Sequence, residues 1–169
     1  HGQSTWNEEG RWAGQADPPL TDLGRLQAKE SCVSLGKFQF TCVSSSCLQR
    51  ARETASIMAN EMDIALLEPL ADLNERHYGE ISGLTALEIE ERYPELMKEW
   101  RVGNPVEIPG GESWQEFVDR VFRGLRHLST HQGCVLVIAH MGVLRAIEHS
   151  LGETKRRHGN LDGMWVDVV

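Results

Sequence analysis

The 169-residue chain carries 17 basic and 25 acidic residues, which gives a formal net charge of −8 at pH 7. Its 40% hydrophobic and 25% charged residues are typical of a globular protein and exclude a disordered one. The acidic balance argues against a general nucleic-acid-binding protein, which needs a basic face, but it is compatible with a local basic pocket for a small anion. The length predicts a single domain over residues 1–169.

The chain contains no apolar run that approaches the roughly 18 residues of a membrane-spanning helix. It also contains no basic segment followed by an apolar stretch, as a secretory leader would have. The four cysteines form no CxxC pair and are too few for a disulfide scaffold in a chain of this size, so we expect reduced and mostly buried thiols. Together these features predict a soluble, cytoplasmic protein with no membrane partner.

The first part of the chain alternates between loop, helix and strand signals. Residues 1–20 are polar and rich in glycine and proline, which predicts a loop. Thr21 is a typical N-cap, and apolar residues at helical spacing follow it as far as Gly36, so a helix is expected between them. Residues 38–43 alternate between apolar and polar side chains, which indicates a strand, and a helix is expected through 50–59.

The middle of the chain is expected to be less regular. A short strand is predicted over 65–67 and an irregular polar segment over 73–83. Thr85 and Glu88 then have the spacing of a capping box, which indicates a short helix that stops before Pro94. Residues 104–111 contain two prolines and two glycines, and the sequence therefore predicts another loop there.

The last third of the chain contains the clearest periodicity. Ser113 and Glu116 form a second capping box, and the apolar residues behind it, among them Trp114, Phe117 and Phe122, keep the spacing of one helix face, so we expect them in the core. A continuous apolar run over 134–139 is typical of a parallel strand buried on both faces.

A helix over 142–151 and a last strand over 164–169 complete the predicted elements. Strands that alternate with helices predict an α/β fold with a mostly parallel sheet. In such folds, ligands bind beyond the carboxyl ends of the strands.

Four polar clusters follow or lie near the predicted strands, and they are the candidate functional segments. They read HGQSTWN at 1–7, RARET at 50–54, NERHYG at 74–79 and AHMG at 139–142. Two histidines, an arginine and a glutamate from these clusters form a coherent set for phosphoryl transfer. A histidine can attack phosphorus, an arginine binds two phosphoryl oxygens, and a glutamate can protonate the leaving oxygen.

These segments resemble, in the same order, the signatures of the histidine phosphatase superfamily, the phosphoglycerate mutase-like family with its RHG motif. The matching stretches are HGQSTWN, LQRARETA, LNERHYG and AHMGVLR, and they span 1–145. The resemblance implies a three-layer α/β/α fold with a mostly parallel central sheet. It also implies a metal-independent enzyme that forms a phosphohistidine and needs no cofactor.

The resemblance assigns roles residue by residue. It implies that His1 is the phosphorylated nucleophile, Arg50 a phosphate-binding arginine, Glu75 the proton donor and His140 the second histidine of the phosphate pocket. Ser4, Asn7 and Gly14 match positions that line the phosphate or substrate pocket, and Arg76 and Tyr78 match positions that contact the rest of the substrate.

The chain departs from the family pattern at two places. The arginine and the central strand that precede the nucleophile in the family are absent, because the sequence begins at His1. We therefore expect upstream residues that form a short apolar strand ending in arginine. Met141 stands where the family often has glycine, and its side chain is expected to crowd the pocket.

The reaction itself is left open between three alternatives. A short connection of 65 positions between Glu75 and His140 and the segment IPGGESWQEF favour a phosphatase of a small phosphorylated metabolite. LNERHYG is typical of a 2,3-bisphosphoglycerate-dependent phosphoglycerate mutase, the second alternative. The third is a non-catalytic module that binds a phospho-ligand. The sequence leaves the oligomeric state open, with a homodimer as one option.

Overall fold

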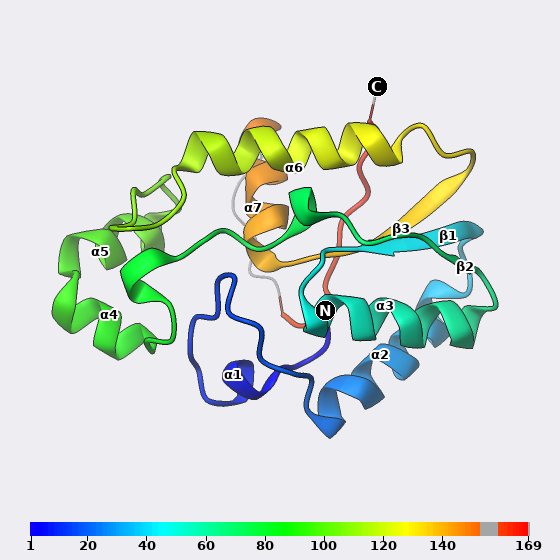
Figure 1. The fold of residues 1–169 in the computed structure, drawn as a ribbon, viewed down its shortest axis with the longest axis horizontal. Coiled ribbons are helices and arrows are strands. Elements are labelled where there is room, and N and C mark those ends of the chain that lie inside the picture. The colour runs from blue at the N-terminus through cyan, green and yellow to red at the C-terminus, as the bar shows by residue number, and fades with distance from the viewer. Residues whose placement is uncertain (153–158, 169) are drawn as a thin grey trace.

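The computed structural model describes residues 1–152 and 159–168. The elements in chain order are α1 (Thr5–Glu8), α2 (Asp22–Leu35), β1 (Phe40–Ser45), α3 (Gln49–Met62), β2 (Ala65–Leu66), the 3-10 turns Ala71–Leu73 and Gly79–Ile81, α4 (Ala86–Arg92), α5 (Pro94–Val102), α6 (Trp114–Leu128), β3 (Cys134–Ile138) and α7 (Met141–Ser150) (Figure 1). The strands pair in the order β2-β1-β3, and both pairings are parallel. The predicted α/β class with a parallel sheet is therefore confirmed.

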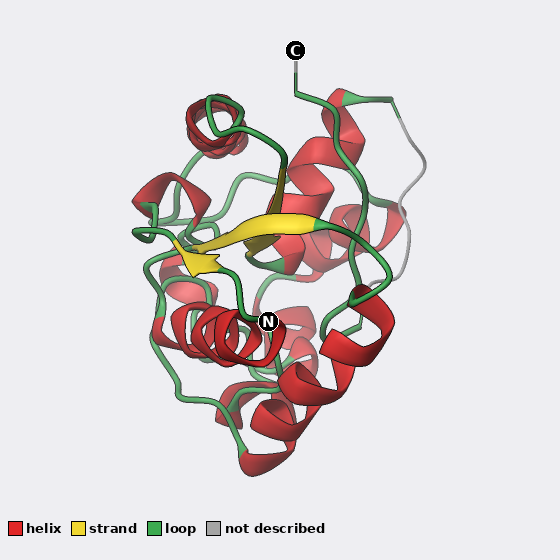
Figure 2. Ribbon diagram, turned by 90° about the vertical axis from the view of Figure 1, so that its right-hand side faces the viewer, coloured by secondary structure: helices red, strands yellow, loops and turns green. Residues whose placement is uncertain are grey.

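Helices cover both faces of the sheet, as the predicted layers require. Val135 and Val137 of β3 contact the apolar cluster of α6 and α7, while Leu136 and Ile138 contact the cluster of α3. This alternation follows from the two-residue period of a strand, which turns successive side chains to opposite faces. Figure 2 shows the strands lying between helices on either side.

The predicted double-sided burial of β3 is only partly correct. Ile138 is buried, but Cys134 to Val137 are half-buried. The reason is that β3 lies at one edge of the three strands that the structure describes. Helices cover both faces of the sheet at β3, but only one of its two long edges has a neighbouring strand.

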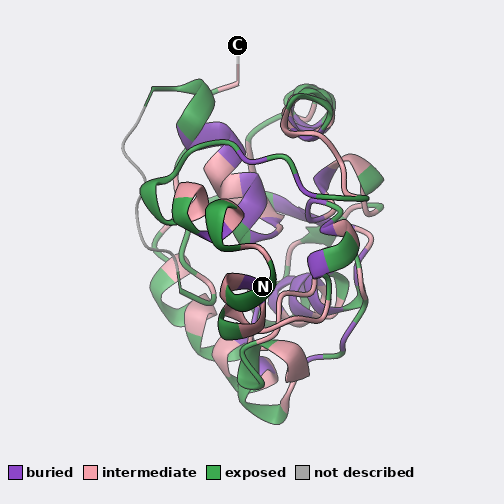
Figure 3. Cartoon of the chain, turned by 90° about the vertical axis from the view of Figure 1, so that its left-hand side faces the viewer, coloured by how far each residue is buried: buried purple, intermediate pink, exposed green. Residues whose placement is uncertain are grey.

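A second apolar layer lies away from the sheet, around α4 and α5. Ile89 and Met97 are buried there together with Ile81 and Ile108. Figure 1 shows α4 and α5 at one end of the molecule, and Figure 3 views that end, where their outer turns are exposed. Helix α5 was not predicted. Its first residue is Pro94, which ends α4 yet fits the first position of a new helix, because that position needs no N–H donor.

Three further expectations need correction. Residues 5–8 form a single helical turn within the predicted loop, because Ser4 and Asn7 make a reciprocal capping box. Residues 164–168 contain no strand, although Met164, Val166 and Val168 pack against the cluster of α6 and α7. Val169 lies outside the described residues. All four cysteines are free, but only Cys42 is fully buried.

Close backbone contact fixes the first residues of the chain against α2. A Cβ atom on Gly2 would collide with the Gly24 carbonyl, and one on Gly24 would collide with the Gln3 carbonyl. The Gln3 carbonyl also accepts a hydrogen bond from Thr21 N at 2.9 Å, and Gln3 N donates to Gln27 Oε1 at 2.9 Å. The two glycines therefore let α2 hold the segment that begins at His1.

No helix of the described residues combines the length and apolar character that crossing a bilayer requires.

Candidate active site

His1 lies where the carboxyl end of β3 meets the first turn of α3. Its amino nitrogen donates to Ala139 O at 3.3 Å, just beyond β3. The next residue is anchored to α3, because Gly2 N donates to Thr54 Oγ1 at 3.1 Å. Thr54 in turn donates to Arg50 O at 2.7 Å. The backbone on both sides of the His1 side chain is therefore held by the sheet and by α3.

The hydrogen bonds of His1 define which ring nitrogen can act as a nucleophile. Nδ1 lies 2.7 Å from Gly2 O, and a carbonyl only accepts, so Nδ1 carries the proton. Nε2 accepts from Arg50 Nε at 3.3 Å, which is consistent with a lone pair on Nε2. The ring is thus held as the tautomer whose Nε2 can attack an electrophile.

Arg50 is a buried cation whose position is fixed by backbone carbonyls of the loop between α1 and α2. It is 2% exposed, and it donates to Ala16 O at 2.8 Å and to Gly14 O at 2.9 Å. Burial lowers the pKa of its guanidinium, and the Glu75 charge partly offsets this, but an arginine stays protonated in proteins. These carbonyls and His1 use three of its five N–H groups, and no further acceptor is recorded among the described residues.

The second histidine faces the first. His140 is 3% exposed, and its ring centroid lies 5.0 Å from that of His1. Burial, and after it the Arg50 charge, holds the pKa of His140 well below its usual range, so the ring is neutral. It lies two residues after the end of β3 and is the N-cap of α7, where the helix dipole favours a negatively charged ligand.

Ser46 determines which nitrogen of His140 carries the proton. Its Oγ lies 2.7 Å from His140 Nε2 and accepts a hydrogen bond from Leu48 N at 3.3 Å. If Nε2 donated to Ser46, the hydroxyl proton of this fully buried serine would have no acceptor among the described residues, at a cost of about 1–3 kcal/mol. Ser46 therefore donates to Nε2, and the proton of His140 is on Nδ1. Nδ1 is buried and bonded to none of the described residues, so it can donate to a phosphoryl oxygen.

Replacing Ser46 with alanine should lower kcat about tenfold, because His140 loses the bond that fixes its tautomer. The measurement is the ¹⁵N shifts of the His140 ring together with kcat. The native protein should give the pattern of a protonated Nδ1, and Ser46→Ala a mixture of tautomers. Ser44→Ala is the matched control, since Ser44 is also buried in β1 and its hydroxyl is unbonded among the described residues. A native ring protonated on Nε2 would refute the assignment.

Glu75 is the buried carboxyl of the site, and backbone groups hold both of its oxygens. Oε1 accepts from Arg76 N at 2.7 Å, and Oε2 accepts from Gly142 N at 3.1 Å, in the first turn of α7. A Cβ atom on Gly142 would collide with Glu75 Oε1, so this position requires glycine. Burial raises the pKa of Glu75, opposed by these two N–H donors and by the Arg50 charge. A raised pKa suits a group that must deliver a proton.

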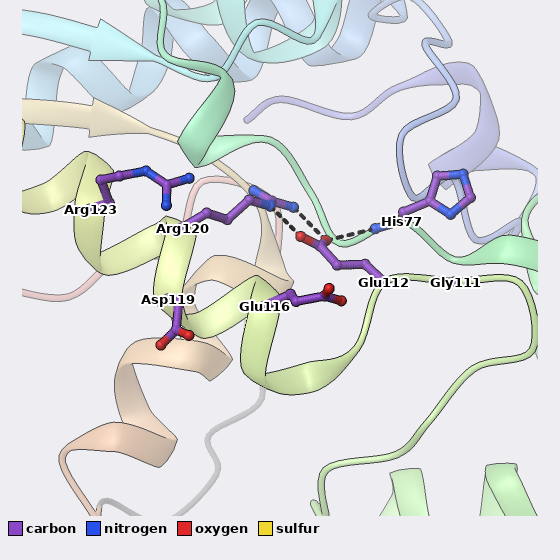
Figure 4. Close-up of a pocket in the computed structure, with 7 residues that line it drawn as sticks. All are labelled: His77, Gly111, Glu112, Glu116, Asp119, Arg120 and Arg123. Atoms are coloured by element: carbon purple, nitrogen blue, oxygen red, sulfur yellow. Dashed lines mark hydrogen bonds and ion pairs between the residues drawn. The ribbon is translucent and has the colours of Figure 1, made fainter.

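The loop that carries Glu75 is supported from below by Arg120 of α6. Arg120 donates to the carbonyls of Asp72, Asn74 and Glu75 at 2.7–2.9 Å. It also pairs with Glu112, with Nε at 2.6 Å from Oε1 and Nη2 at 2.8 Å from Oε2. Figure 4 shows this pair in a surface hollow that His77, Glu116 and Arg123 also line. Because Arg120 is fully engaged in this way, we interpret the hollow as the outer side of the loop that carries Glu75.

The residues that the resemblance places along the phosphate or substrate pocket lie around the site. Ser4 is fully buried and bonded to Asn7, and this pair forms the cap of α1. Asn7 also accepts from Asn160 Nδ2 at 3.4 Å. Gly14 contributes the carbonyl that holds Arg50, and a Cβ there would press against Tyr78. The structure thus gives Ser4 and Gly14 supporting positions, and their substrate contacts stay predictions.

Arg76 and Tyr78 line a cavity of about 390 Å³ that begins beside Glu75. Its wall continues with Gly142 and Arg145 of α7 and with Trp100 of α5. Burial, and after it the Glu75 charge, raises the pKa of the Tyr78 hydroxyl, so this group stays neutral. Met141, which was expected to crowd the pocket, is 44% exposed and does not line this cavity.

Sequence reasoning missed four residues of the site, namely Ser46, Arg120, Arg145 and Trp100. Each acts through a partner far away in the chain, as Ser46 does through His140, 94 positions later. Trp114 was expected only in the core. It is half-buried against the cluster of α6 and α7, but it also lines the cavity.

The chain belongs to branch 1 of the histidine phosphatase superfamily, whose family model matches residues 1–162. It is 39% identical over 152 residues to a metal-independent phosphoserine phosphatase of Arabidopsis thaliana. That match covers 87% of this chain but 64% of the plant protein, so the chain spans less than two thirds of that relative's length.

Mutases and other phosphatases are similar as well. A 2,3-bisphosphoglycerate-dependent phosphoglycerate mutase of Gloeobacter violaceus is 37% identical over 159 residues, which cover 87% of this chain and 70% of the mutase. A solved mycobacterial glucosyl-3-phosphoglycerate phosphatase in complex with VO3 superposes with a TM-score of 0.81 at 30% identity and covers 89% of this chain and 77% of its own. These relatives support an enzyme of the phosphatase or mutase type.

Proposed function

We propose that the protein is a phosphatase of a small phosphorylated metabolite and that it works through a phosphohistidine on His1. The observation that carries the proposal is the attacking geometry: Nε2 of His1 holds a lone pair beside the buried Arg50 guanidinium. The second histidine and a carboxyl with a raised pKa lie around it. No step needs a resident metal ion.

In the first step, His1 Nε2 attacks phosphorus, and an N–P bond forms as the P–O bond to the leaving group breaks. Arg50 and Nδ1–H of His140 stabilise the negative charge on the phosphoryl oxygens. Glu75 donates its proton to the leaving oxygen and becomes a carboxylate.

In the second step, the Glu75 carboxylate takes a proton from a water molecule, which attacks the phosphorus. The N–P bond breaks, phosphate leaves and Glu75 is protonated again. Glu75 therefore alternates between its two protonation states, and the burial that raises its pKa favours the protonated state that starts each cycle.

The test is turnover of p-nitrophenyl phosphate by the purified protein expressed from its own gene, with and without EDTA. We expect a steady-state rate that EDTA leaves unchanged, because the scheme assigns no step to a metal. Loss of activity with EDTA that Zn²⁺ or Mg²⁺ restores would refute the metal-independent mechanism.

A phosphoglycerate mutase is the second candidate, because the segment around Glu75 that carries Arg76 and Tyr78 has the mutase-like sequence LNERHYG. A mutase returns the phosphoryl group to a bound glycerate instead of to water. Conversion of 3-phosphoglycerate to 2-phosphoglycerate that requires a bisphosphoglycerate primer, with negligible release of phosphate, would favour this candidate and overturn the phosphatase.

A further inference from the structure

Arg120 of α6 uses every hydrogen-bond donor of its guanidinium on the loop that carries Glu75 and on Glu112. Nη1 donates to Asp72 O at 2.9 Å and to Asn74 O at 2.7 Å, and Nη2 donates to Glu75 O at 2.9 Å. The remaining N–H groups, on Nε and Nη2, donate to the two carboxylate oxygens of Glu112. A guanidinium has five N–H groups and a lysine ammonium only three, so arginine is the side chain that can make this set of contacts.

Glu112 joins the start of α6 to the same loop through its own backbone. Its carbonyl accepts from Arg76 Nε at 2.9 Å, and its N–H donates to His77 O at 3.0 Å. The side chains of Arg120 and Glu112 are only 12% and 15% exposed. The pair is therefore largely shielded from water, where an interaction between charges is stronger than at the surface.

The same helix packs against α7, which donates to the Glu75 carboxyl. Phe117 is fully buried, and its ring lies so close to Gly142 that a Cβ atom there would be 3.2 Å from Phe117 Cζ. Arg120 Cζ lies 4.8 Å from the centroid of the Phe117 ring. The apolar cluster that α6 and α7 share completes this contact. Helix α6 therefore contacts both the loop that carries Glu75 and the first turn of α7.

The position of the Glu75 carboxyl depends on the distance between this loop and α7. Oε1 accepts from Arg76 N, which belongs to the loop and moves with it, whereas Oε2 accepts from Gly142 N of α7. Gly142 lies in the first turn of its helix, where an N–H has no acceptor within the helix itself. A loop that moved away from α7 would therefore lose this bond and displace the carboxyl from the reacting phosphoryl group.

We propose that Arg120, held by Glu112, is a positioning residue for proton transfer, because it keeps the loop at the distance from α7 that the Glu75 carboxyl needs. Arg120 acts through Glu75 and does not itself contact the substrate. The catalytic part of this inference rests on the proposed function, which makes Glu75 the proton donor. An arginine that served stability alone would affect all substrates equally, whereas a positioning residue affects most the substrates whose leaving group needs the proton.

The first test compares two esters that differ in their need for a proton. In single turnovers, Arg120→Ala should cleave phenyl phosphate about 100-fold more slowly than the native protein, because the basic leaving oxygen needs the displaced carboxyl. Cleavage of p-nitrophenyl phosphate should slow by no more than about threefold, since nitrophenolate leaves without a proton. Equal losses with the two esters, or no loss with either, would overturn the positioning role.

Arg123→Ala is the matched control. Arg123 lies in the same helix and lines the same hollow, but it is exposed and pairs with the Asp72 carboxylate instead of with the loop carbonyls. Both rates should therefore stay within about twofold of the native values.

Glu112→Gln is a second variant, and it carries the test if thermal unfolding shows that Arg120→Ala is unfolded at the assay temperature. It keeps the carbonyl contacts of Arg120 but removes the charge of the partner. We expect a loss of about tenfold that is confined to phenyl phosphate. A loss of the same size with both esters would count against the positioning role here too.

The hollow in Figure 4 makes a rescue experiment possible. Its volume is about 630 Å³ and it is lined by Arg120 and Glu112, so a small cation can reach the place that the side chain leaves in Arg120→Ala. Millimolar guanidinium chloride should raise the cleavage of phenyl phosphate by this variant at least about tenfold, because guanidinium has the same planar donors. It should leave the native protein and Arg123→Ala unchanged. No recovery beyond that with the same concentration of sodium chloride would overturn the proposal.

Amide hydrogen exchange separates this inference from the proposed function, because it requires no turnover. Arg120→Ala should raise the exchange rate of Gly142 N–H at least about tenfold, and Arg123→Ala should not. If the native protein hydrolyses no ester but exchange rises in this way, the phosphatase is wrong and the positioning of Glu75 stands. If esters are hydrolysed but Gly142 exchanges equally in the native protein and in Arg120→Ala, the positioning role is wrong and the phosphatase stands.

Discussion

Replacing His1 with alanine should lower the hydrolysis of p-nitrophenyl phosphate by about 10⁴-fold or more, because the covalent step loses its nucleophile. The remaining Arg50, His140 and Glu75 would still bind the phosphoryl group but would have no nitrogen lone pair to accept it. The substitution removes the ring whose Nδ1 bonds Gly2 O, while the backbone anchor from Gly2 N to Thr54 is kept. The fold should therefore persist.

One measurement and one control variant check this result. Rapid quenching with ³²P-labelled substrate should trap an acid-labile phosphoprotein with the native chain and none with His1→Ala. His127→Ala is the matched control, because His127 is an exposed histidine in the last turn of α6, and it should keep the native rate. Full labelling in His1→Ala would mean that another residue carries the phosphoryl group.

Glu75→Gln should lower kcat by about 10²–10⁴-fold for an ester with a poor leaving group, since no carboxyl remains to move the proton. With p-nitrophenyl phosphate, whose leaving group needs no proton, the first step should persist. A burst of about one equivalent of nitrophenol followed by slow turnover is therefore expected, because the attack by water still lacks its base. An unchanged steady-state rate with both esters would refute the assigned role.

The pH profile of the native protein follows from the same group. Turnover of a poor leaving group needs a protonated Glu75, so the rate should fall as the pH rises through its pKa, which burial places above the usual glutamate value. It should fall in acid as His1 becomes protonated and loses its lone pair. For the burst with p-nitrophenyl phosphate, the fall in rate at alkaline pH should disappear, because this leaving group needs no proton. The same is expected for the burst of nitrophenol from Glu75→Gln.

The stability of Glu75→Gln needs its own check. Both Glu75 oxygens accept backbone N–H groups, and the amide nitrogen of glutamine cannot accept. One N–H of Arg76 or Gly142 would be left unbonded, at a cost of about 1–3 kcal/mol. Thermal unfolding of the variant separates this loss from the catalytic one, because the burst can be measured well below the unfolding temperature.

Local signals were sufficient to predict the parallel pairing and most of the helices, though not α1 and α5. Thr21, Thr85 and Ser113 cap α2, α4 and α6 as their spacing indicates, because a capping bond needs only residues within one turn. Helix α5 was missed because Pro94 was interpreted only as a stop. Residues 164–168 have apolar side chains at every second position, as a strand does. This pattern indicates which side chains pack inward, but it does not indicate whether the backbone pairs with another strand.

The four central residues of the site could be predicted because short motifs carry them. His1 contacts both Arg50 and His140 in the structure. Glu75 is joined to this group by the N–H of Gly142, two residues after His140, which donates to the Glu75 carboxyl. Their partners could not be predicted in the same way. Whether Ser46 bonds a histidine depends on how β1 and β3 are paired, and a three-dimensional register of this kind leaves no pattern in a local stretch of sequence.

The layer of α4 and α5 supplies one wall of the cavity, whereas the groups proposed for the chemistry lie at the sheet edge and on the loop before that layer. Substitutions in the cavity wall can therefore change the shape of the cavity without changing the groups proposed for the chemistry. Changes at Trp100 or in the loop after α5 would reshape the cavity while His1, Arg50 and His140 keep their contacts. A scaffold divided in this way lets one reaction serve many metabolites.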